Sequence, residues 1–199
     1  MEFILFKKIF VILLISYLQL SAYHSIMVNM NNEELETNIN LDLAQFIDKF
    51  PVNKYFIGYN YLYIEHNIET INTMQTVNIL MKSRLQNYRP ITFTLGTKFI
   101  SADMNHKSIS AVPFGFAMKF ELPINSLPIS FYAQVFYSPK PLTFSDGDTY
   151  LEQKYELSFE VIEKGQIFIG YRDISSTLQK SGETLEFSKI PYAGLRIGF

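Results

Sequence analysis

Apolar and polar residues alternate with a period of two along most of the chain after residue 24, which is the spacing of β-strands with one apolar face. The clearest case is residues 154–161, K-Y-E-L-S-F-E-V. We predict strands at residues 25–30, 34–43, 55–66, 77–84, 91–99, 108–122, 129–137, 154–161, 166–172 and 190–199. Strands of this pattern, repeated from end to end, are typical of a membrane β-barrel.

The segments between the predicted strands fall into two classes. We predict short turns at residues 87–90, 123–128 and 163–165, and longer polar loops at residues 67–74, 103–107, 138–149 and 175–188. Outer-membrane barrels have short turns at one rim and longer loops at the other. The predicted fold is therefore all-β, an antiparallel transmembrane β-barrel of about ten strands with both termini on the short-turn side. Eight strands with a separate N-terminal hairpin are the alternative.

Pro113 lies inside the predicted strand at residues 108–122. Proline has no backbone N–H to donate, so in a closed sheet it is found at bulges or strand ends. We expect Pro113 to mark a bulge or a position on the outer rim.

The two ends of the chain carry signals of export and of barrel closure. Lys7 and Lys8 precede the apolar residues 9–15, and the small residues Ser21 and Ala22 follow, which is the order of a secretory signal peptide. We expect residues 1–22 to be a signal peptide and residues 23–199 to be the barrel, with an uncleaved membrane anchor as the alternative. The last predicted strand ends on Phe199, on its apolar face.

The composition excludes several kinds of site. There are 18 Phe and 13 Tyr but no Trp and no Cys, so thiolate zinc sites, disulfides and cysteine nucleophiles are excluded. The formal net charge of −2 gives no basic field for a nucleic acid. We expect no cofactor, no metal and no nucleic-acid partner.

If the apolar faces meet lipid, the charged residues on the opposite faces line the lumen, since Lys or Arg at the lipid midplane costs about 2–4 kcal/mol. The residues expected inside are Glu34, Glu36, Lys82, Lys98, Lys119, Glu121, Lys154, Glu156, Glu160, Arg172 and Arg196. From these we select a candidate lumen charge cluster of Lys119, Glu121, Lys154, Glu156, Glu160, Arg172 and Arg196. The cluster has two interpretations, a selectivity site or a structural ion network. Because both signs occur, we expect a narrow or filled lumen.

Other candidate chemistry is sparse. His66 and His106 fall at predicted strand ends near Ser101 and Ser108, where a histidine would act as general base for a serine of a lipid-modifying enzyme. The alternative is that these histidines, and His24, are ordinary loop residues. In the segment D-G-D, residues 146–148, the two carboxylates are compatible with a calcium site or with a plain turn.

Several motifs resemble those of the YfaZ family of outer-membrane proteins. They are A-Q-V-F-Y-S-P-K-P-L-T-F-S-D-G-D-T-Y-L-E (residues 133–152), Y-E-L-S-F-E-V-I-E-K-G-Q-I-F-I-G-Y-R (155–172) and Y-A-G-L-R-I-G-F (192–199). Earlier in the chain, Y-N-Y-L-Y (59–63) and L-G-T-K-F-I-S-A-D (95–103) also resemble it. The resemblance implies a porin-like barrel of the Gram-negative outer membrane, with no settled substrate. It also implies that the barrel-assembly machinery reads Phe199 as an end signal.

From these observations we expect an integral outer-membrane β-barrel without a catalytic site. It would be surrounded by outer-membrane lipid and would serve as a narrow channel for small solutes or as a structural membrane protein. Two alternatives stay open, a lipid-modifying enzyme at the rim and a soluble periplasmic barrel that binds an apolar ligand inside.

Overall fold

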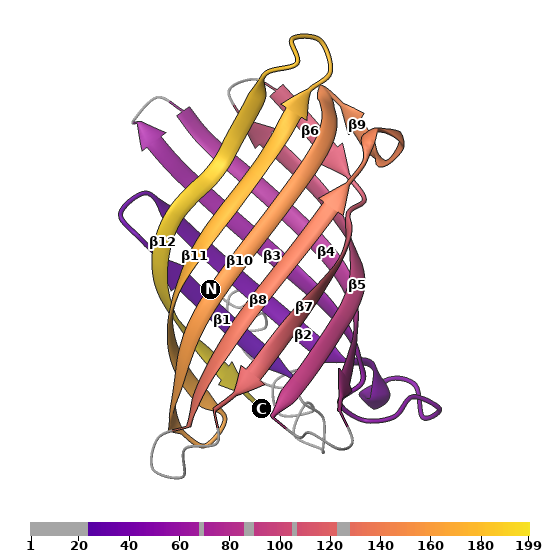
Figure 1. Ribbon diagram of the computed structural model, residues 1–199, viewed down its shortest axis with the longest axis vertical. Coiled ribbons are helices and arrows are strands. Elements are labelled where there is room, and N and C mark those ends of the chain that lie inside the picture. Colours follow the sequence, from indigo (N-terminus) through magenta and orange to yellow (C-terminus); the bar gives the residue numbers. More distant parts are fainter. Residues whose placement is uncertain (1–23, 68–69, 86–89, 105–106, 123–127) are drawn as a thin grey trace, which may run out of the picture.

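The alternating segments form an antiparallel sheet that closes on itself into a barrel (Figure 1). The computed structural model describes residues 24–67, 70–85, 90–104, 107–122 and 128–199. Consecutive strands pair with one another, and β1 (Ser25–Met30) pairs with β12 (Thr184–Gly198) to close the ring. Closure leaves the backbone groups of the paired residues satisfied on both sides of each strand.

The remaining elements follow in chain order around the ring. The first half contains β2 (Glu34–Asp42), η1 (Leu43–Gln45), β3 (Tyr55–Asn67), β4 (Thr70–Arg84) and β5 (Ile91–Met104). The second half contains β6 (Lys107–Ala111), β7 (Phe114–Glu121), β8 (Ile129–Ser138), η2 (Lys140–Leu142), β9 (Thr143–Ser145), β10 (Gly147–Ile162) and β11 (Gly165–Leu178). No helix among the described residues is long and apolar enough to cross a membrane.

Within the described residues, twelve strand segments make up ten barrel strands, which confirms the predicted number. β6 and β7 both pair with β5 and together form one interrupted barrel strand. β8 and β9 form another, because they pair in turn with β7 and β6. The alternative of eight strands with a separate hairpin is wrong, since β1 and β2 are part of the closed ring.

Pro113 lies in the interruption between β6 and β7, as its missing N–H predicts. Its carbonyl oxygen still accepts hydrogen bonds from the Lys98 backbone N–H at 3.0 Å and from Thr97 Oγ1 at 3.2 Å. The interruption therefore stays hydrogen-bonded to β5, and the register with β5 is the same on both sides of it, so Pro113 lies at a strand end and not at a bulge.

The two ends of the barrel differ. We call the end that carries the β11–β12 turn the upper end, and the end that carries the C-terminus and η1 the lower end (Figure 1). Phe199 accepts from and donates to the backbone of His24 there, with both distances 3.0 Å. The predicted location of the two barrel termini at one end is therefore correct.

The strands extend further toward the upper end than the sequence predicted. β4 begins at Thr70 and β5 ends at Met104, while β10 begins at Gly147. β11 ends at Leu178 and β12 begins at Thr184, so little of the loop predicted at residues 175–188 remains. The predicted alternation of short turns with long loops is therefore wrong. The polar segments interpreted as loops are largely strands, whose outward side chains near the upper end are polar.

The lower end is held by Asp42, which is fully buried at the start of η1. Its carboxylate accepts hydrogen bonds from the backbone N–H of Ala44 at 3.0 Å and of Asn53 at 2.6 Å. The backbone N–H of Asp42 donates to His24 Nδ1 at 3.0 Å. The Asp42 side chain thus fixes the loop between β2 and β3, and its backbone N–H connects this loop to His24, the residue before β1.

We predict that Asp42→Ala lowers the free energy of unfolding by about 2–4 kcal/mol, because two backbone N–H groups lose a charged acceptor. Urea titration followed by far-ultraviolet circular dichroism measures this change. Asp48→Ala is the matched control, since Asp48 is exposed on the same loop, and it should change stability by less than about 0.5 kcal/mol. Equal unfolding midpoints for the two variants would contradict the assigned role of Asp42.

Candidate functional site

The outer face of the lower and middle barrel is apolar. Its outward side chains are at least about a third exposed, although they are large and hydrophobic. We call this surface the apolar belt; it consists of Ile26, Val28, Met30, Leu35, Ile39, Ile57, Tyr59, Val77, Ile79, Phe93, Leu95, Phe99, Phe114, Phe116, Phe131, Tyr155, Ile167, Ile169, Tyr171, Leu195 and Ile197. A contiguous apolar surface of this extent indicates contact with a partner or a lipid phase.

Above the apolar belt, most outward side chains are polar, although Phe144 of β9 is also exposed. Exposed Gln75 and Ser101 face one another across β4 and β5, and exposed Asp103 follows toward the upper end. On β12 the exposed side chains Glu186 and Lys189 form an ion pair at 3.1 Å. The outer face therefore changes from apolar to polar along the barrel axis.

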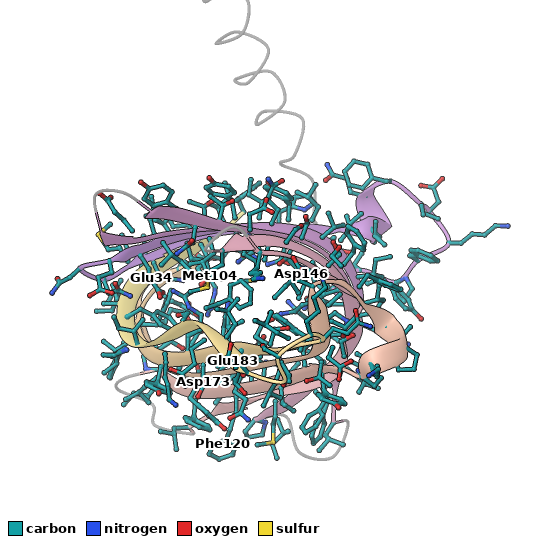
Figure 2. All side chains as sticks on the ribbon, turned by 90° about the horizontal axis from the view of Figure 1, so that it is seen from above. Glu34, Met104, Phe120, Asp146, Asp173 and Glu183 are labelled. Atoms are coloured by element: carbon teal, nitrogen blue, oxygen red, sulfur yellow. The ribbon has the colours of Figure 1, made fainter. Side chains whose placement is uncertain are left out.

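The interior changes in the opposite direction, from apolar near the upper end to charged and polar further down. Seen from above, side chains fill the space enclosed by the strands (Figure 2). Near the upper end they form an apolar layer of Leu62, Ile64, Met74, Ile100, Ala102, Met104, Ile109, Ala111, Tyr150, Ile174 and Phe187. Each of these residues is at most 4 % exposed, so the apolar layer closes the lumen at this level.

Beneath the apolar layer lies an ion-pair network centred on Arg172, whose side chain is completely buried. Its guanidinium forms ion pairs with Glu34 and with Glu36, and its Nε donates to Ser188 Oγ at 2.9 Å. Ser188 Oγ in turn donates to Glu34 at 2.9 Å. The network therefore joins β11 and β12 to β2 across the point where the ring closes.

Lysines extend the network across the barrel. Lys154 of β10 pairs with Glu36 at 2.5 Å and with Glu152 at 3.7 Å. Lys98 of β5 holds the same Glu152, with Nζ at 2.7 and 2.8 Å from its two carboxylate oxygens. Lys98 Nζ also lies 4.1 Å from the centre of the Phe136 ring, a cation–π contact.

A further ion pair lies closer to the lower end. Arg196 of β12 contacts the Glu156 carboxylate at 2.6 Å, and Tyr192 donates to the same carboxylate at 3.0 Å. The guanidinium carbons of Arg196 and Arg172 lie 4.9 and 5.0 Å from the ring centres of Phe168 and Tyr192, respectively. Aromatic rings thus cover the faces of both arginines.

The network also bridges a gap in the wall of the barrel. Backbone pairing between β1 and β12 ends at Met30 and Ala193, so the residues of β12 above Ala193 have no partner from β1. Ser188 lies in this part of β12, which pairs with β11 but not with β1. Its side chain instead donates a hydrogen bond to Glu34 at the tip of the β1–β2 hairpin. Side-chain hydrogen bonds thereby replace the backbone ladder at the seam.

Below the apolar layer, the interior contains a polar cavity of about 100 Å³. The charged groups that line it belong to the ion-pair network, and Met74 closes it toward the upper end. Its uncharged polar lining consists of Asn38, Asn40, Asn60, Thr76, Asn78, Thr94, Tyr132 and Gln134. We call this space the lower chamber.

The structure brings together four residues of the candidate lumen charge cluster, namely Lys154, Glu156, Arg172 and Arg196. The other three lie apart. Lys119 and Glu121 pair with each other at 3.1 Å near the lower rim, where Glu121 also binds Arg84 at 2.8 Å. Glu160 is exposed beside the β10–β11 turn, so its inclusion in one cluster is wrong.

Among the other residues expected inside, Glu34, Glu36 and Lys98 belong to the network. Lys82 lies instead over the ring of Phe56, with Nζ 3.9 Å from its centre. The sequence interpretation missed Glu152, because it lies next to a segment interpreted as a loop. It also missed Ser188, because it lies in another such segment, although the charge pattern of β10 could have identified Glu152.

The remaining candidate groups have local partners. Asp146 accepts from the Ser108 backbone N–H at 3.2 Å, and Asp148 pairs with Lys140 at 2.9 Å, so each carboxylate serves the β6–β9–β10 connection. His106 and the side chain of His66 lie outside the described residues. The Phe199 ring is half-buried, 5.5 Å from the ring centre of buried His24. Its role as an assembly signal stays a prediction, as does the signal peptide, which lies outside the described residues.

Comparison with known proteins gives one family. A family model described as YfaZ precursor matches residues 7–199, which is nearly the whole chain. No curated protein matches the chain significantly.

We predict that Arg172→Met lowers the free energy of unfolding by about 3–5 kcal/mol, because it leaves the buried Glu34 carboxylate without a counter-charge and leaves Glu36 with Lys154 alone. Combining it with Glu34→Gln should cost less than the sum of the single changes, by about 0.5–3 kcal/mol. A double-mutant cycle in urea measures this coupling.

Lys189→Met is the control for this cycle, since Lys189 makes an exposed ion pair on β12. It should alter stability by less than about 1 kcal/mol. Strict additivity of the Arg172 and Glu34 changes would show that the two side chains are not coupled.

Proposed function

Because the chain belongs to the YfaZ family, we propose that it is an integral β-barrel of the Gram-negative outer membrane with a porin-like lumen. The observation that carries the proposal is the reversal of polarity along the barrel. In its lower and middle part, the exposed outer face is apolar and the interior holds ion pairs. A hydrocarbon phase around the apolar belt satisfies both faces, since lipid-facing charges are costly and lumen-facing charges are tolerated.

The soluble alternative fits this arrangement less well. A soluble barrel for an apolar ligand places its apolar side chains inside and leaves its outer face polar. That pattern holds only near the upper end, where the apolar layer is already filled by side chains. The upper end is therefore proposed to project out of the membrane, with its polar outer face in water.

The proposed transport function is passage of small solutes through a narrow lumen. The apolar layer blocks the lumen for hydrated solutes, since a hydrophobic constriction resists wetting. Passage would require water to enter the apolar layer, as in gates that open and close by wetting. The balanced charges beneath it favour weak selectivity between anions and cations. If the apolar layer never opens, the protein conducts nothing and its role is structural.

We further propose that the protein has no catalytic role and that its partners are outer-membrane lipid and the barrel-assembly machinery, which would read Phe199. Ser101, one of the residues considered for a rim enzyme, is an exposed side chain on the outer face of β5, as is Asp103 nearby. The Ser108 backbone is engaged by Asp146 in the β6–β9 connection. These positions favour a structural role for the rim.

To test the membrane location, we compare Leu95→Arg with Ser101→Arg in protein refolded into phospholipid vesicles. Both residues lie on the outer face of β5, Leu95 in the apolar belt and Ser101 above it. Arg at position 95 should lower stability by about 2–4 kcal/mol and Arg at position 101 by no more than about 1 kcal/mol. Equal and small effects of both substitutions would favour the soluble barrel.

To test the closed lumen, we propose planar-bilayer conductance of Ile100→Ser beside the unchanged protein. Ile100 is fully buried in the apolar layer. A hydroxyl and a smaller volume should help water enter, so we expect larger or more frequent current steps than in the unchanged protein.

Phe99→Ser is the control for conductance, because Phe99 is the neighbouring residue on the outer face. It should leave the current unchanged. Large, steady steps in the unchanged protein would show that the apolar layer is not the barrier, and silence of all three proteins would favour the structural role.

A further inference from the structure

Two asparagine side chains meet in the wall of the lower chamber, and neither closure of the lumen nor the ion pairs explain their position. Asn40 of β2, Gly58 of β3 and Asn78 of β4 lie side by side in register. The two asparagine side chains lie over the space that a Gly58 side chain would occupy. A Cβ at position 58 would collide with Asn40 Oδ1 and would lie 2.7 Å from both amide atoms of Asn78. Glycine therefore leaves room for two amides at one place in the chamber wall.

Two of the amide oxygens there lack a donor. Asn40 Oδ1 and Asn78 Oδ1 are buried and have no hydrogen-bond partner among the described residues. Asn78 is only 4 % exposed, and both side chains line the lower chamber. Since buried polar atoms in proteins are almost always hydrogen-bonded, these two oxygens indicate an occupant that donates.

The charges around the chamber restrict the kind of occupant. Lys98 pairs with Glu152, Lys154 with Glu36 and Arg196 with Glu156, so each cation that lines the chamber already has a carboxylate. An ionic ligand would have to compete with these contacts. An uncharged ligand with hydroxyl donors leaves them intact and satisfies the free oxygens.

The size and closure of the chamber restrict the occupant further. Its volume of about 100 Å³ accommodates a molecule of glycerol size, or about three waters. The apolar layer closes it toward the upper end, so a solute reaches it from the lower end. Gln134 and Tyr132 supply further polar groups on the opposite wall, contributed by β8.

We propose that the lower chamber binds a small uncharged polyol through Asn40 and Asn78. The site deepens the porin-like function proposed above, because it names the class of solute that the lumen would accept from its lower end. Binding does not require the apolar layer to open. A barrel can therefore bind a polyol and conduct nothing, or conduct ions and bind no polyol, and the two proposals fail separately.

The test is saturation-transfer-difference nuclear magnetic resonance on the full chain refolded in detergent, with glycerol, glycine and acetate as probes. Glycerol should give a saturable signal, and zwitterionic glycine and anionic acetate should give much weaker ones. Asn78→Leu and Asn40→Leu should each weaken glycerol binding at least tenfold. Asn32→Leu, the same change on the exposed β1–β2 turn, should leave it unchanged.

Three results would overturn the proposal. No glycerol signal in the unchanged protein means that water alone fills the chamber. A signal that does not saturate, or that both chamber variants retain, means that glycerol binds elsewhere. Stronger binding of glycine or acetate means that the charged groups select the ligand. Folding of each variant is checked by a heat-dependent gel shift. The comparison of the three probes uses the unchanged protein alone, so it tests the proposed ligand class even where a leucine variant does not fold.

Discussion

Each charge of the ion-pair network inside the barrel has an opposite charge in contact with it, and this requirement governs how the strands are placed. Glu34, Glu36, Glu152 and Glu156 meet Lys98, Lys154, Arg172 and Arg196 on strands from both halves of the chain. Removing one partner of a buried ion pair is costly, because the other is left without hydration. Shifting β2 by two residues would keep the same face inward but would place Asn38 where Glu36 now meets Lys154 and Arg172. The network therefore selects one register among those that the alternation alone allows.

Two opposite arrangements of polar and apolar side chains follow one another along the barrel axis. Near the upper end the barrel is built as a water-soluble domain is, with an apolar layer inside and polar side chains such as Gln75 and Ser101 outside. In its lower part the arrangement is inverted, with the apolar belt outside and ion pairs and amides inside. The two parts share continuous strands, so each long strand changes the polarity of both of its faces partway along. That change places the closed section of the lumen directly above the polar chamber.

The change of polarity also explains which parts of the structure the sequence predicted. Where charges face inward and apolar side chains outward, the alternation is strong, and it gave the strand number, the outward residues of the belt and the inward position of Arg172, Lys154 and Glu156. Near the upper end the outward face is mostly polar and the inward face is mixed, so the sequence pattern predicts loops at residues 70–74 of β4 and 184–188 of β12. The pairing of particular charges could not be predicted, because it depends on the register between strands far apart in the chain. The convergence of Asn40 and Asn78 likewise depends on Gly58 between them, and no local pattern reveals it.

The seam between β1 and β12 has a consequence for the order in which the protein is made. Arg172 lies 138 positions after Glu34 and Ser188 lies 154 positions after it, so the partners of the N-terminal hairpin are synthesised in the last third of the chain. Until β12 is in place, the sheet has two free edges and Glu156 lacks its counter-charge Arg196. Open edges recruit other strands. A chain that ends before β12 therefore keeps both edges of its sheet open to pairing with other strands.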